Sequence, residues 1–176
     1  MDISILVAYS SKHGATRQIA ERIGEKLRAC NLGTTVAAVE HKPDIIGHSA
    51  AVIGSAVYFG HWRREAVDFV RLNRPLLETR QVWLFSSGPL GDPSLVDPKP
   101  VAELIDEVDA IGHRVFDGAL DTKSLSLLEA TVVGMVARQT KPHRDLAGDF
   151  RDWDAIDEWA GEIAEHLLAA PAEEVT

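Results

Sequence analysis

Short apolar runs alternate with amphipathic stretches along this chain. Residues 3–9 show no two-residue alternation of apolar and polar side chains, which is typical of a parallel strand buried on both faces. Ile19, Ile23 and Leu27 then recur every four residues among charged neighbours, which predicts an amphipathic helix. By the same criteria we expect further strands at residues 34–39, 51–57, 81–86 and 114–120, and helices at 64–73, 101–108, 125–139 and 152–169.

Two of these helices have a clear buried face. In the helix at 64–73 we expect Val67, either Phe69 or Val70, and Leu72 to be buried. Pro75 lies just past its end, where a helix commonly stops. The last helix has a more consistent apolar stripe, formed by Ile156, Trp159, Ala160, Ile163 and Leu167.

The alternation of strands and helices predicts the fold class. Parallel strands joined by right-handed crossovers give an α/β three-layer sandwich, with helices on both faces of the sheet. Five strands fit the order 2-1-3-4-5, in which ligands bind at the carboxyl ends of the strands. We expect one domain at residues 1–170 and a frayed tail at 171–176.

Composition narrows the class of protein. The 176 residues are 45% apolar and 26% charged, as in ordinary globular proteins, and the net charge of -9 argues against a nucleic-acid binder. The single cysteine, Cys30, cannot form an internal disulfide, so we expect a cytoplasmic protein in which Cys30 is an inert packing residue. No signal sequence and no run of 18 apolar residues is present, so no transmembrane segment is expected.

The loop after the first strand, residues 10–16 (the first loop), carries candidate chemistry. It has neither a Gly-x-Gly-x-x-Gly fingerprint nor the Gly-Lys-Ser/Thr ending of a nucleotide-binding P-loop. It does combine the hydroxyls of Ser10, Ser11 and Thr16 with backbone amides that lead into a helix N-terminus, and such a loop can hold a phosphate monoester. The alternative is a structural turn in which Thr16 caps the helix.

The first loop also carries a family resemblance. Residues 7–23 resemble the flavodoxin signature, in which the motif positions are taken by Tyr9, Ser11, Gly14, Thr16 and Ala20. Ala8 departs from that pattern, because a larger residue is usual there. The resemblance implies a flavodoxin-like fold that binds FMN. The FMN phosphate would be held by Ser10, Ser11, Lys12, His13, Gly14, Ala15 and Thr16.

The same resemblance assigns two further loops to the flavin ring. The second loop, residues 58–62, would cover one face of the ring through Tyr58, Phe59, Gly60 and His61, with Trp62 as a further aromatic residue. The third loop, residues 87–92, would cover the other face through Ser87, Gly88, Pro89, Leu90, Gly91 and Asp92. Leu90 stands where many flavodoxins have an aromatic residue, so stacking on that side is weaker.

Positive charge directly after the start of the second loop suggests a redox role. Our hypothesis is that His61, Arg63 and Arg64 stabilise reduced flavin and raise its potential.

Within the family, the chain is most similar to flavodoxin-type, menaquinone-dependent protoporphyrinogen oxidases. That similarity lies in the segments 59–62, 118–120 and 152–153. It implies an FMN-dependent oxidoreductase with a small-molecule substrate and a quinone or other redox partner, peripheral to the inner face of a membrane.

Other classes of function share parts of this pattern. A non-enzymatic one-electron carrier of the flavodoxin type needs the same cofactor and stays open, as does a binding domain without a cofactor. A phosphorelay receiver is excluded, because the ends of the first and third strands, Tyr9-Ser10 and Ser55-Ala56, lack the required carboxylates. The seven histidines show no His-x-x-x-His or His-x-His spacing, so no metal site is expected.

Overall fold

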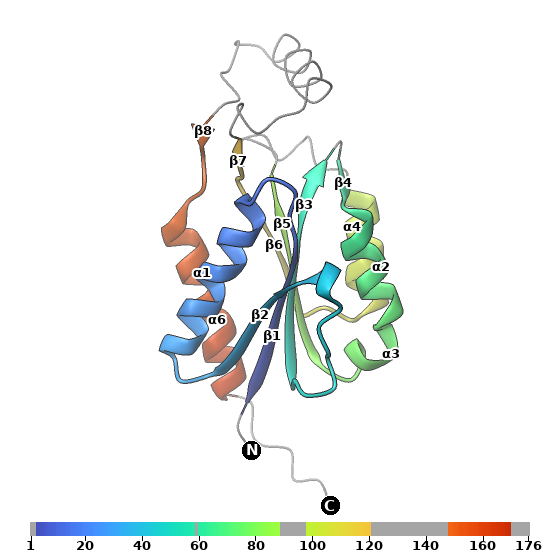
Figure 1. The fold of residues 1–176 in the computed structure, drawn as a ribbon. Coiled ribbons are helices and arrows are strands. Elements are labelled where there is room, and N and C mark those ends of the chain that lie inside the picture. The colour runs from blue at the N-terminus through green and yellow to red at the C-terminus, as the bar shows by residue number, and fades with distance from the viewer. Residues whose placement is uncertain (1–2, 59, 89–97, 121–147, 170–176) are drawn as a thin grey trace, which may run out of the picture.

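A parallel sheet forms the centre of the computed structural model, which describes residues 3–58, 60–88, 98–120 and 148–169 (Figure 1). Its parallel strands are β1 (Ser4–Ser10), β2 (Gly33–Ala38), β3 (Ala50–Tyr58), β5 (Gln81–Ser87) and β6 (Gly112–Phe116). They are hydrogen-bonded in the order β2-β1-β3-β5-β6, which confirms the predicted 2-1-3-4-5 topology. The short strand β4 (His61–Trp62) pairs antiparallel with the end of β3.

Helices cover both faces of this sheet (Figure 1). One face carries α1 (Ala15–Ala29) and α6 (Trp153–Ala169), and the other carries α2 (Arg64–Leu72), α3 (Arg74–Leu77) and α4 (Pro98–Glu107). A 3-10 helix (Val39–His41) follows β2. Beyond the carboxyl edge of the sheet, β7 (Ala119–Leu120) and β8 (Gly148–Asp149) form a two-stranded antiparallel pair (Figure 1). The predicted three-layer α/β sandwich is confirmed.

Two hydrophobic clusters fill the spaces between the layers. On the α1/α6 side, the rings of Phe85, Phe116 and Trp159 meet at centroid distances of 5.5–6.2 Å. All five residues of the apolar stripe predicted for the last helix are buried in this cluster. Side chains of β1, β3 and β5 enter both clusters, which explains why their sequences lack polar alternation.

The helix predicted at 64–73 packs somewhat differently from expectation. Phe69 and Val70 are both buried, whereas Leu72 is 81% exposed, so its predicted burial is wrong. At 3.6 residues per turn, Leu72 lies roughly 110° around the helix from the centre of the buried face. Pro75 follows the end of α2 as expected and stands in the first turn of α3, where its missing N–H costs no helical hydrogen bond.

Some predicted segments are divided or cannot be compared with the structure. The strand predicted at 114–120 is two strands, β6 and β7, separated by Asp117 and Gly118. The helix predicted at 125–139 and the tail at 171–176 lie outside the described residues. Among the described helices, none has both the length and the apolar character needed to cross a membrane.

Candidate functional site

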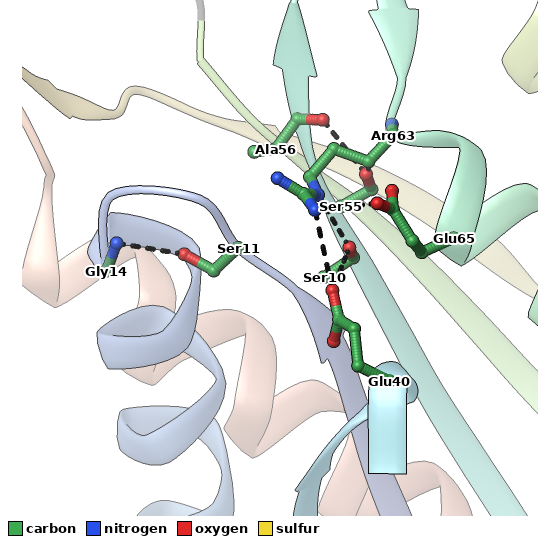
Figure 2. Close-up of polar contacts among 8 residues, drawn as sticks. All are labelled: Ser10, Ser11, Gly14, Glu40, Ser55, Ala56, Arg63 and Glu65. Carbon is green, nitrogen blue, oxygen red and sulfur yellow. Dashed lines mark hydrogen bonds and ion pairs between the residues drawn. The ribbon is translucent and has the colours of Figure 1, made fainter. Parts of the chain in front are cut away.

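The first loop joins the end of β1 to the start of α1. Gly14 is the residue that caps α1, and its φ of 90° is in the left-handed region that favours glycine. Its N–H donates to Ser11 Oγ at 3.1 Å (Figure 2). Thr16 lies inside the helix and is buried, so the alternative in which Thr16 caps the helix is wrong.

The helix end behind this loop is suited to an anion. The first turn of α1 contains no acidic residue, and its capping residue, Gly14, makes no side-chain hydrogen bond to the N–H groups of that turn. The positive end of the helix dipole is therefore not offset from within its own first turn. A Cβ added to Gly14 would meet nothing within 4 Å, so the space beside this turn is open. Both features fit a phosphate group.

Ser10 takes part in a different set of contacts. Its side chain is fully buried, and its hydroxyl donates to Glu40 Oε1 at 3.0 Å. The same hydroxyl oxygen accepts a hydrogen bond from Arg63 Nε at 2.8 Å (Figure 2). Among the residues proposed from sequence for the phosphate, Ser10 therefore has its hydroxyl engaged with charged side chains from outside the first loop.

Ser10 is one member of a row of serines. Ser10, Ser55 and Ser86 are neighbours in register on β1, β3 and β5, and each is fully buried. We call these three residues the serine row. By strand alternation they lie on the same face of the sheet as the cluster beneath α2 and α4. Buried hydroxyls need hydrogen-bond partners, and the described structure supplies them from the last residue of the second loop and the residue that follows it.

Residues 62 and 63 bind all three members of the serine row. The backbone N–H of Arg63 donates to Ser55 Oγ at 3.0 Å, and Trp62 Nε1 donates to Ser86 Oγ at 2.8 Å. Ser86 Oγ also lies 2.9 Å from His113 Nε2 on β6, and burial lowers the pKa of that histidine. With the bond from Arg63 Nε to Ser10, the second loop is anchored to three adjacent strands.

The second loop places its aromatic residues in two environments. Trp62 is 5% exposed and packs in the core, so it is not available as a face for the ring. Tyr58 is half-buried and contacts the first loop: the His13 ring meets it edge-on at 6.3 Å, and Lys12 Nζ lies 5.9 Å from its centroid. Gly60 has a φ of 81° and His61 is exposed, while Phe59 lies outside the described residues.

The third loop begins at the same edge of the sheet. Ser87 is buried, and the N–H of Gly88, whose φ is 92°, donates to the carbonyl of Phe116 at 2.9 Å. A Cβ added to Gly118 would lie 3.4 Å from the Gly88 Cα, so the two glycine backbones are close. Four residues proposed for this loop lie outside the described part of the chain, namely Pro89, Leu90, Gly91 and Asp92.

Charge near the second loop is balanced by carboxylates. An Nη atom of Arg63 lies 3.0 Å from Glu65 Oε1 and 3.6 Å from Glu40 Oε1 (Figure 2). Arg64 is 90% exposed and lies 3.4 Å from Asp68. Both arginines are thus paired with carboxylates. Their positive charge is therefore partly neutralised, which weakens the argument that these two arginines raise the flavin potential.

A second buried arginine supports the start of α1 and was not predicted from the sequence. The Arg151 side chain is 7% exposed, and its guanidinium binds Asp149 through two hydrogen bonds of 2.5 and 2.7 Å. It also donates to Gln18 Oε1 at 2.5 Å and to the Ala15 carbonyl at 3.5 Å. These bonds lower the pKa of the Asp149 carboxyl and fix β8 against the helix that follows the first loop.

Comparison with known proteins tests the family resemblance. A family model described as a flavodoxin domain matches residues 6–147. The chain belongs to the flavodoxin family. Members of this family bind FMN. In this flavodoxin domain the open glycine turn and the uncapped helix end fit the FMN phosphate, and no described cluster of three metal-binding side chains suggests a metal centre.

Solved structures share the fold of this flavodoxin domain at low sequence identity. A flavodoxin from the domain Archaea is 15% identical, with a TM-score of 0.61 over 94% of this chain and 99% of its own. Flavodoxin 1 from Bacillus cereus is 14% identical, with a TM-score of 0.61 over 93% and 98%. Rubredoxin oxygen:oxidoreductase from Desulfovibrio gigas is 14% identical, with a TM-score of 0.63 over 95% of this chain and 37% of its own. A search of curated proteins finds no match.

Proposed function

We propose that this chain binds FMN at the carboxyl edge of its sheet and transfers electrons through it. The observation that carries the proposal is the first loop, in which a left-handed Gly14 precedes a helix whose first turn holds no acid and no side-chain cap. Such a helix end stabilises a phosphate through its backbone N–H groups and its dipole. Family membership supports the same cofactor.

The phosphate is assigned to the first loop. The backbone amides of Lys12, His13, Ala15 and Thr16 would donate to it, whereas the Gly14 N–H is engaged with Ser11. The hydroxyls of Ser11 and Thr16 would add donors. Ser11 Oγ accepts the Gly14 N–H and so fixes the turn, which leaves its own proton free to be directed outward. Lys12 and His13, which contact Tyr58, would add positive charge beside the dianion.

The flavin ring is assigned to the space between the second and third loops. When bound, FMN supplies one-electron and two-electron redox chemistry. Tyr58 would provide an aromatic face, and the positive-φ residues Gly60 and Gly88 would let the backbone approach the polar edge of the ring. Because the buried serine row holds residues 62 and 63, the protein needs little reorganisation to keep the second loop in place.

Direct binding measurements test this proposal. Purified protein reconstituted with FMN should be yellow, and calorimetry should give a one-to-one complex. Ser11→Ala should weaken binding by about tenfold to a hundredfold, because loss of a charge-assisted hydrogen bond costs roughly 1.5–3 kcal/mol. Ser49→Ala, at the opposite edge of the sheet, is the matched control and should bind as the wild type does. Wild-type protein that ignores FMN would refute the proposal.

A finer proposal is that the chain is an oxidoreductase of the protoporphyrinogen oxidase type. It rests on the motif resemblance at residues 59–62, 118–120 and 152–153. Within it, the close backbones of Gly88 and Gly118 bring the start of the third loop against the segment 118–120. The test is anaerobic: a porphyrinogen substrate should reduce the bound flavin, and menaquinone should reoxidise it. A protein that binds FMN but shows neither reaction would favour the alternative of a one-electron carrier.

A further inference from the structure

Arg63 forms hydrogen bonds to side chains at the ends of both β1 and β3. Its backbone N–H donates to Ser55 Oγ on β3, and its Nε donates to Ser10 Oγ on β1. Ser10 directly precedes Ser11 of the first loop, and Arg63 directly follows Trp62 of the second loop. Through one residue, the chain therefore links the segments assigned to the two ends of FMN (Figure 2).

The geometry of this link depends on the shape of the guanidinium. Nε reaches Ser10 while an Nη atom lies 3.0 Å from Glu65 and 3.6 Å from Glu40. Glu40 in turn accepts from Ser10, so the group closes on itself. A guanidinium offers several donors in one rigid plane, whereas a lysine ammonium offers a single point charge on a flexible stem. The Arg63 side chain is 17% exposed, so water replaces these bonds poorly.

We propose that Arg63 is a positioning residue that fixes the second loop relative to the first, so that the ring and the phosphate of one FMN molecule are held together. This inference rests on the proposed function. A ligand with two linked groups gains affinity only when both subsites lie at the correct separation. Loss of the link should therefore reduce the advantage of FMN over riboflavin, which lacks the phosphate and needs the second and third loops alone.

Arg63→Lys is the decisive variant because it keeps the positive charge and removes the planar donor set. We expect the ratio of the riboflavin to the FMN dissociation constant, measured directly or by competition, to fall about tenfold. Arg64→Lys is the matched control, since its side chain is 90% exposed and pairs with Asp68 alone among described groups. That control should keep the wild-type ratio.

The possible outcomes distinguish a failure of this inference from a failure of the proposed FMN-binding function. A wild-type ratio in Arg63→Lys would show that charge alone suffices and would overturn the inference, and so would equal losses for both flavins. Thermal denaturation of the apoprotein checks folding; if Arg63→Lys does not fold, Ser10→Ala removes the same bond and must lower the ratio in the same direction. If the wild type binds no FMN, the proposed function fails whatever the variants do.

Discussion

The indole Nε1 of Trp62, on β4, donates a 2.8 Å hydrogen bond to the hydroxyl of Ser86, on β5. Ser86 Oγ is also within 2.9 Å of His113 Nε2, so a single buried hydroxyl joins β4, β5 and β6. Because Trp62 ends the second loop, this bond fixes one end of the segment assigned to the flavin.

Removal of that hydroxyl should destabilise the fold. Ser86→Ala leaves the buried Trp62 N–H without its acceptor, and an unsatisfied buried donor costs about 1–3 kcal/mol of unfolding free energy. Urea denaturation of the apoprotein measures it. Ser49→Ala is the control: its hydroxyl belongs to an exposed residue, so water replaces the lost bonds and the change should stay within about 0.5 kcal/mol. Equal midpoints for the two variants would contradict the prediction.

His113 should make stability depend on pH. Burial lowers the pKa of His113 in the folded protein below the value of about 6.5 expected when unfolded. The unfolded chain therefore takes up the proton more readily, and the stabilisation is complete above that value and is lost as the pH falls through the folded-state pKa. His113→Gln, which cannot be protonated, should flatten the fall in stability between about pH 7.5 and 5. Parallel stability curves for the two proteins would rule this out.

Gly54 should not tolerate a side chain. A Cβ at this position would lie 2.0 Å from Phe85 Cζ, and Phe85 is itself fully buried against Phe116 and Trp159. Gly54→Ala should therefore cost about 1–3 kcal/mol through overpacking. Gly161→Ala, in α6 with nothing within 4 Å of the new Cβ, should instead gain roughly 0.5–1 kcal/mol from helix propensity. Calorimetric melting of both variants decides, and destabilisation of similar size in both would contradict the argument.

Gly14 should matter for backbone conformation alone. A Cβ there meets nothing within 4 Å, but its φ of 90° is strained for any L-amino acid and costs about 1–3 kcal/mol. Gly14→Ala should therefore lower stability and weaken FMN binding together, because the turn that presents the amides relaxes. Gly47→Ala is equally open and has no positive φ, so it should leave both quantities unchanged. A Gly14→Ala protein with wild-type FMN affinity would show that the turn is not the phosphate site.

The layers of this fold can be predicted from the spacing of apolar residues, because burial of a strand or a helix face requires a regular spacing of such residues. Strands such as β1 are buried on both faces, and α6 packs one face on the sheet, so apolar spacing alone identifies them. Leu72 shows the limit of that reasoning. Leu72 lies at the end of α2, and its apolar side chain does not by itself determine whether that position faces the sheet or the solvent.

The first loop can be proposed as a site from local chemistry alone, since its residues are contiguous. The serine row cannot, because it consists of three serines far apart in sequence that only the strand register brings together. The pairing of Arg63 with Glu40 and Ser10 was missed for the same reason. The sequence shows that Arg63 directly follows the second loop. Only the fold shows that its guanidinium contacts the carboxylates of Glu40 and Glu65 and the hydroxyl of Ser10.

The β7–β8 pair has a consequence for redesign of this protein. Ala119 pairs with Asp149 and Leu120 with Gly148, so residues 120 and 148, which are far apart in sequence, lie side by side. A peptide segment inserted between residues 120 and 148 would therefore have its two ends close together. The entropy cost of closing such a loop grows only slowly with its length. We therefore expect that the segment between β7 and β8 can be exchanged for another sequence without disturbing the α/β sandwich.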